Sequence, residues 1–131
     1  MGTRKNIQSG APWESRAAYS RAVRVGRHNM VSGTAPVGDR GEVVGEGDAY
    51  VQATRCIEII AAALKEAGAG LEHVVRTRMF VTDIGKWPEV ARAHHEAFGE
   101  VMPATSMVEV SQLIDPAMLV EIEADALLED D

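Results

Sequence analysis

Side chains that could do chemistry are scattered along this sequence rather than gathered in one motif. His94-His95-Glu96 offers imidazole and carboxylate groups. Neighbouring residues of a helix point about 100° apart, and no second ligand pair at helical spacing accompanies them, so a metal site is not predicted. Ser106, His94 and Asp83 are the residue types of a catalytic triad, but no triad is predicted because the sequence has no Gly-x-Ser-x-Gly turn.

Two other features invite a chemical interpretation, and neither supports one. Cys56 is the only cysteine, which excludes an internal disulfide. It falls within a helical pattern beside Ile57 and Ile60, where a small buried residue is the expected role. The glycine-rich stretch 38–47 lacks the spacing of a phosphate-binding loop. The sequence therefore predicts no metal site and no phosphate-binding loop.

Length and charge narrow the class of protein. The chain has 131 residues and a net charge of −7, which predicts a single domain over residues 1–131 and argues against nucleic acid as a partner. Residues 1–15 are expected to form a flexible arm and residues 128–131 an acidic tail. No apolar run is long enough for a membrane span, and the start has no apolar core of signal-peptide type, so a cytoplasmic protein without membrane contact is predicted.

The hydrophobic pattern predicts the elements that must position any site. A helix is expected from the N-cap Asp48 to Ala67, where Gly68 stops it. A second helix follows Asp83 and ends before Gly99. The expected strands are 21–24, 30–34, 74–81, 105–110 and 120–126, with a short additional one at 42–44. The order ββ(β)αβαββ predicts an α+β two-layer domain in which a mixed sheet packs on two helices.

The alternation in the last two strands predicts which side chains share a face of the sheet. Val108 and Val110 are expected to face the helices together with Ile122, Ala124 and Ala126. The opposite face then carries Thr105, Met107, Glu109, Glu121 and Glu123. A polar, acidic face of this kind either stays in water or forms the wall of a cleft or a subunit interface.

Several segments in fixed order resemble the RidA (YjgF) family over about residues 19–127. They are Tyr19-Ser20-Arg21-Ala22-Val23, Val31-Ser32-Gly33-Thr34, His73 to Asp83, Pro103 to Val110, and Val120-Glu121-Ile122-Glu123-Ala124. The resemblance implies a chorismate-mutase-like fold, a homotrimer and three ligand clefts between subunits. It also implies hydrolysis of enamines and imines to 2-keto acids and ammonia, without metal or organic cofactor.

The resemblance also implies roles for individual residues. Members of the family clamp the substrate carboxylate with an arginine, line the cleft with a cysteine, and position water or a proton with a glutamate. At these three positions the sequence has Thr105, Met107 and Glu121. The cleft wall is completed by Tyr19 and by the Ser32-Gly33 turn.

Thr105 is a chemical departure from the family pattern, because an arginine offers a charged fork of donors and a threonine one neutral hydroxyl. Hydrogen bonds to charged groups contribute roughly 1.5–3 kcal/mol against ~0.5–1.5 kcal/mol for neutral ones, so 2-imino-acid binding is expected to weaken by roughly one to three orders of magnitude.

Three functions remain open from the sequence. The first is a trimer that binds and hydrolyses an imine, enamine or related compound other than the standard 2-imino acids, with Glu121 as the acid–base group. The second is a non-catalytic ligand-binding or regulatory trimer. The third is an ordinary 2-iminobutyrate or 2-aminoacrylate deaminase in which Arg24, Arg76 or Arg78 replaces the missing arginine. The charge of −7 argues against ribonuclease activity, a label that some relatives carry.

Overall fold

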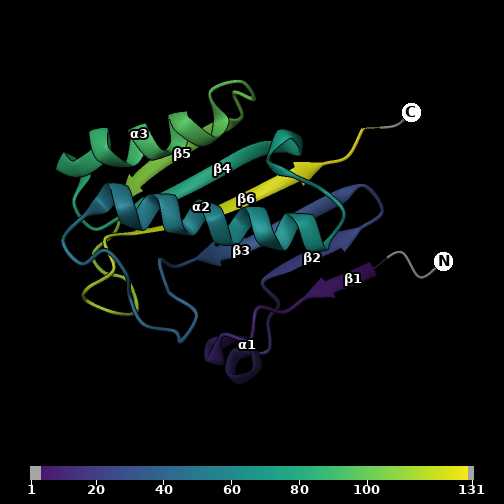
Figure 1. Ribbon diagram of the computed structural model, residues 1–131, viewed down its shortest axis with the longest axis horizontal. Coiled ribbons are helices and arrows are strands. Elements are labelled where there is room, and N and C mark those ends of the chain that lie inside the picture. Colours follow the sequence, from purple (N-terminus) through teal and green to yellow (C-terminus); the bar gives the residue numbers. More distant parts are fainter. Residues whose placement is uncertain (1–3, 130–131) are drawn as a thin grey trace.

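The computed structural model describes residues 4–129 and has a six-stranded mixed sheet with two long helices on one face (Figure 1). Strand order in the sheet is β1-β2-β3-β6-β4-β5, and only β4 and β5 run parallel. The elements are β1 (Arg4–Ile7), α1 (Pro12–Ala17), β2 (Ala22–Val25), β3 (His28–Thr34), α2 (Ala49–Glu66), β4 (Val74–Val81), α3 (Trp87–Phe98), β5 (Ala104–Glu109) and β6 (Val120–Leu127), with short 3-10 turns at Leu71–His73 and Ile84–Lys86.

The long helices and the central strands confirm the α+β prediction. Helix α2 begins where the sequence predicts, because the Asp48 carboxylate accepts a hydrogen bond from the Val51 amide at 3.0 Å. Gly68, with φ +88°, supplies the turn after its end. Between α2, α3 and the sheet lies the core, in which Ile60, Leu64, Phe98, Val120 and Ile122 are almost completely buried.

The N-terminal segment differs from the predicted flexible arm. From Arg4 onward it forms β1, which pairs with β2, and then α1, which lies beyond the sheet edge (Figure 1). Ile7 and Glu14 are both buried. This order comes from long-range pairing and from one buried ion pair, which a stretch without hydrophobic periodicity does not reveal. The predicted strand at 42–44 is reduced to a single bridge between Val37 and Val43. The predicted acidic tail lies partly outside the described residues.

The predicted orientation of β5 is wrong. Thr105 and Met107 pair in parallel register with Thr77 and Met79, which are buried under the helices, so all four share the helix face. By the same alternation, Ser106 and Val108 lie on the open face with Glu121 and Glu123. The other two residues of the predicted pattern also differ from expectation. Glu109 lies on the helix face, and Val110 lies beyond the end of the strand.

The physical reason is that β5 is an edge strand with apolar residues on both of its faces. Met107 packs against the core, whereas Val108 is 46% exposed. Alternation within a single strand therefore does not show which face the helices cover. In β6 it does, because every second residue is fully apolar and the residues between them are acidic, and there the prediction is confirmed.

Candidate functional site

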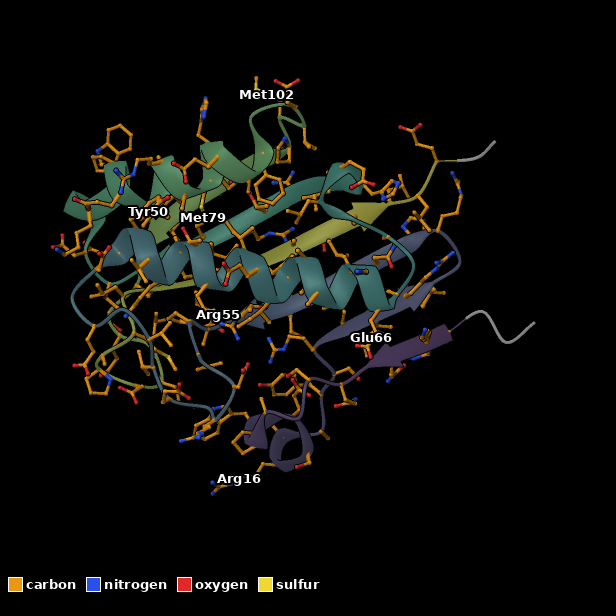
Figure 2. The ribbon with its side chains drawn as sticks, viewed as in Figure 1. Arg16, Tyr50, Arg55, Glu66, Met79 and Met102 are labelled. Carbon is orange, nitrogen blue, oxygen red and sulfur yellow. The ribbon has the colours of Figure 1, made fainter. Side chains whose placement is uncertain are left out.

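A groove of 1170 Å³ runs between the N-terminal segment, the loop after β3, one side of α2 and the start of β6. Tyr19, Gly33 and Glu121, which the sequence analysis selects, all line it. Helix α2 contributes Arg55 and Glu66, whose side chains Figure 2 shows on the side of the helix that faces α1. The volume is sufficient for a small organic ligand.

Glu121 is one of the carboxylates that line this groove. It lies on the open face of β6 and packs over Gly33, where the β3–β6 register shifts between Val31 and Thr34. A Cβ atom at Gly33 would lie 2.5 Å from Glu121 Oε2, so glycine permits this close approach. Burial raises the pKa of Glu121 and nearby Glu123 adds to the rise, while the Arg21 guanidinium opposes it.

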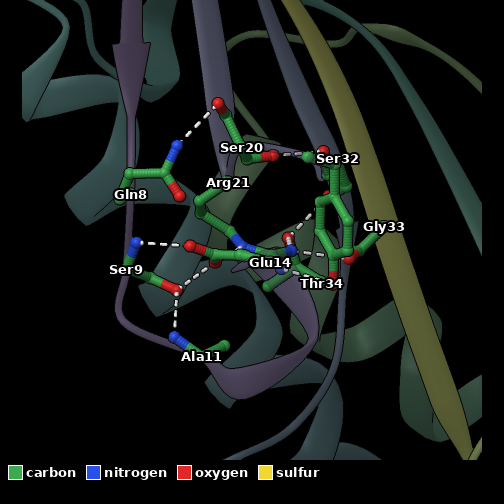
Figure 3. A network of polar contacts seen from close by, with 10 residues as sticks. Gln8, Ser9, Ala11, Glu14, Ser20, Arg21, Ser32, Gly33 and Thr34 are labelled. Atoms are coloured by element: carbon green, nitrogen blue, oxygen red, sulfur yellow. Dashed lines mark hydrogen bonds and ion pairs between the residues drawn. The ribbon is translucent and has the colours of Figure 1, made fainter. Parts of the chain in front are cut away.

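Arg21 is a buried cation held by hydrogen bonds to the protein (Figure 3), and its charge acts on Glu121. Its Nε donates to Glu14 at 3.1 Å, and its Nη1 donates to the Gly33 carbonyl at 2.6 Å and to Thr34 Oγ1 at 3.2 Å. Nη2 donates to the Tyr19 hydroxyl at 3.4 Å. These bonds engage most of the five N–H donors of the guanidinium, so Arg21 fixes the shape of the groove more than it offers a carboxylate clamp.

Glu14 is the counter-ion of Arg21 and is 2% exposed. Burial raises the pKa of Glu14. Hydrogen bonds from the Ser9 hydroxyl and amide, together with Arg21, lower the pKa by more than burial raises it, so the pKa of Glu14 is below its usual range. The pair thus ties the β1–α1 connection to the start of β2 and to the Gly33 turn. Ser32, which is also predicted to shape the pocket, donates its hydroxyl to the Ser20 carbonyl at 2.7 Å.

Thr105 and Met107 lie away from the groove in a single chain. Thr105 Oγ1 accepts a hydrogen bond from Thr77 Oγ1 at 2.6 Å, and Thr77 Oγ1 lies 2.8 Å from His94 Nε2 on α3. Met107 packs against the core. Since Glu121 is on the opposite face of the sheet, one protomer does not bring Thr105 and Glu121 together.

None of the three arginines predicted to replace the missing carboxylate clamp has its side chain beside Thr105 in this chain. Arg24 donates to the carbonyls of Gly26 and Ala67, at the far end of α2. Arg76 and Arg78 lie on the open face of β4, and Arg78 forms ion pairs with Glu123 at 3.1 Å and Asp125 at 3.2 Å. The guanidinium whose charge lowers the pKa of Glu121 is instead that of Arg21.

Sequence reasoning missed Arg21 and its partner Glu14. One local signal was available, because Arg21 follows Tyr19 by two residues and an extended segment directs such residues to the same side. No comparable signal identifies Glu14, which reaches the site only through the fold of the segment 8–21.

Taken together, the structure defines a small α+β protein in which a groove surrounds a half-buried carboxylate. The chain matches the family described as Endoribonuclease L-PSP over residues 9–128, and it belongs to this family. Its fold is the chorismate-mutase-like fold of the YjgF proteins. No helix in residues 4–129 is long and apolar enough to cross a membrane.

Three relatives illustrate the relationship. A Mycobacterium tuberculosis member of the YjgF/YER057c/UK114 family has a crystal structure that matches with a TM-score of 0.87 at 48% identity, covering 95% of this chain and 99% of that one. A RutC family protein of Pyrococcus abyssi is 40% identical over 112 residues, which is 85% of this chain and 87% of the relative. The 3-aminoacrylate deaminase RutC of Acinetobacter baylyi is 33% identical over 106 residues, covering 81% and 83%.

Proposed function

We propose that this protein is a cofactor-free hydrolase of imines, enamines or related compounds, in which Glu121 is the acid–base group. The observation that carries the proposal is the placement of Glu121: a half-buried carboxylate with a raised pKa over the Gly33 backbone, in a ligand-sized groove. A raised pKa suits a group that must both take and return a proton near neutral pH. A relative named 3-aminoacrylate deaminase supports the reaction class.

The reaction needs only water and one proton carrier. Water adds to the carbon of the protonated C=N bond while the Glu121 carboxylate takes one proton from the water, which gives a neutral carbinolamine. Glu121 then returns this proton to nitrogen and the C–N bond breaks as ammonia leaves. The hydroxyl oxygen becomes the carbonyl by giving its proton to Glu121, and this proton leaves with the ammonia as ammonium. Tyr19 and the Gly33 turn shape the pocket around these atoms.

The proposal includes a homotrimer with the cleft between subunits. Thr105 and Glu121 lie on opposite faces of one sheet, so a cleft containing both requires two protomers. The open face of the sheet also exposes apolar residues that association would bury: Val25, Met30 and Val108 are each at least 40% exposed. Light scattering at micromolar concentration tests the assembly, and a stable monomer would contradict it.

The substrate proposed is not a standard short 2-imino acid. Thr105 takes the place of the family arginine, and Arg21 is engaged by Glu14, Gly33 and Thr34 instead of being available as a substitute.

Glu121→Gln tests the acid–base role. Turnover of freshly generated imines, including 2-iminobutyrate as the reference compound, is expected to fall by about 10²–10⁴-fold. Glu123→Gln is the matched control, because it lies on the same face of the same strand but pairs with Arg78. Equal turnover by wild type and Glu121→Gln would refute this role, and wild-type activity on 2-iminobutyrate equal to that of an arginine-bearing relative would refute the altered specificity.

A non-catalytic ligand-binding trimer is the second candidate, favoured by the loss of the arginine at Thr105. Under this alternative, Glu121→Gln leaves ligand-induced thermal shifts in place and no substrate is turned over. Ribonuclease activity, which the family description names, is disfavoured by the net charge of −7. Salt-dependent retention on RNA would argue for it.

A further inference from the structure

A chain of three polar side chains crosses from α3 to the edge of the sheet. His94 Nε2 lies 2.8 Å from Thr77 Oγ1, and Thr77 Oγ1 donates to Thr105 Oγ1 at 2.6 Å. Thr77 is fully buried, His94 is partly buried against Phe98, and Thr105 is exposed. The chain therefore begins inside the protein and ends on a hydroxyl that a ligand can reach.

The direction of these hydrogen bonds follows from counting protons. A threonine hydroxyl has one proton and two lone pairs. When Thr77 donates its single proton to Thr105, His94 is the donor in the other contact, and this order requires a proton on Nε2. Thr105 receives a hydrogen bond from Thr77, so its own proton remains for an outside partner. Each bond in such a chain polarises the next and strengthens the last donor.

We propose that this chain makes Thr105 an outward-facing hydrogen-bond donor for a neutral carbonyl oxygen of the substrate, such as that of an amide or ester, with His94 as the positioning residue. The inference rests on the proposed function, which places Thr105 in the cleft, and it specifies the substrate class. A neutral hydroxyl matches a neutral acceptor, whereas a carboxylate would meet no full positive charge from Thr105.

The first test measures the position of the proton without any ligand. Nitrogen NMR of the full chain with isotope-labelled histidine, assigned by comparison with His94→Gln, is expected to show Nε2 of His94 protonated when the imidazole is neutral. A neutral His94 with its proton on Nδ1 would overturn the inference, because Thr77 would then donate to His94 and Thr105 would have to donate inward to Thr77. This result would not affect the role proposed for Glu121.

The second test compares two probes of similar size, neutral pyruvamide and anionic pyruvate, by calorimetry at millimolar concentration. Wild type is expected to bind pyruvamide more tightly, and Thr105→Val to lose about 2–10-fold of that affinity. Thr105→Ser should retain it. Thr105→Arg should reverse the preference toward pyruvate. His94→Leu should weaken pyruvamide binding. His94→Gln can still donate from its amide and should retain binding. His95→Leu, on the exposed side of α3, is the control.

The outcomes separate the inference from the proposed function. Unchanged pyruvamide affinity in Thr105→Val, or binding of neither probe by wild type, would overturn the donor role of Thr105. Imine turnover that depends on Glu121 would uphold the proposed function in both cases. Conversely, a Thr105-dependent preference for pyruvamide without turnover would uphold the donor role and favour the non-catalytic alternative.

Discussion

Two polar networks in this protein, one around Glu14 and Arg21 and one from His94 to Thr105, differ in charge and in exposure. In the network around Glu14 and Arg21, both partners carry a full charge, both are almost completely buried, and nearly every donor ends on a protein atom. The network from His94 to Thr105 contains only hydroxyls and an imidazole, and its last member is exposed. The comparison shows that the buried cation holds a turn in place, whereas the second network ends on a neutral, exposed hydroxyl.

Breaking the charged network should have the largest effect on stability. Arg21→Ala leaves the Glu14 carboxylate buried without its counter-ion and frees the Gly33 carbonyl, so the free energy of unfolding is expected to fall by about 3–5 kcal/mol. Urea unfolding measures this change. Arg78→Ala is the matched control: its ion pairs with Glu123 and Asp125 are partly exposed, and its loss should cost at most about 1 kcal/mol. Equal losses in the two variants would show that Arg21 is not the structural cation proposed here.

Restoring a charge at the end of the neutral network should have the next largest effect. Thr105→Arg supplies the guanidinium that the family resemblance implies at this position, and the exposed position accommodates it. Turnover of 2-iminobutyrate is expected to rise by roughly one to three orders of magnitude. Ser106→Arg, one residue along on the opposite face, should produce no gain. A Thr105→Arg variant that folds and assembles but gains no activity would mean that more of the cleft than its anchor has changed.

Glu121 feels the charge of Arg21 in the charged network, and its ionisation should carry a small cost to stability. Its pKa is raised in the folded protein, so the folded state holds the proton more tightly than the unfolded state does. The cost is absent below the unfolded pKa, appears as pH rises through the raised folded value, and is complete above it. Glu121→Gln is therefore expected to be more stable than wild type at pH 8 by up to about 1 kcal/mol, with the gain disappearing at low pH. Thermal unfolding across this range measures it, and a less stable variant at pH 8 would contradict it.

The sequence predicts the interior of the fold better than its edges. Asp48 and Gly68 mark the ends of α2, and the strict alternation of β6 places Glu121 on the correct face, because local chemistry or a two-sided pattern decides each of these features. The edge strand β5 offers no such contrast, so the side occupied by Thr105 and Met107 depends on its pairing with β4.

The candidate site shows the same limit. Tyr19, Gly33 and Glu121 meet in one groove as the family resemblance implies, but the cation beside them does not come from the predicted arginines. Arg24 and Arg78 are bound elsewhere, and Arg21 is brought in by Glu14 from a segment with no periodic pattern. A contact that depends on the path of an irregular segment is visible only in three dimensions.

The smallest predicted effect concerns the imidazole that begins the neutral network. Burial lowers the pKa of His94, and the neighbouring charge of His95 adds to this, so the unfolded state binds the proton more readily than the folded state. His94 then contributes no pH dependence well above its unfolded pKa of about 6.5, and lowers stability as pH falls from there through the folded value. His94→Gln keeps an amide donor for Thr77 but does not titrate. Between pH 7 and pH 5 it should lose less stability than wild type by up to about 1 kcal/mol in urea unfolding. If the free energy of unfolding changed with pH equally in wild type and His94→Gln, His94 would bind its proton equally well in the folded and unfolded states. The hydrogen-bond chain to Thr105 would then have to be explained without a desolvated imidazole.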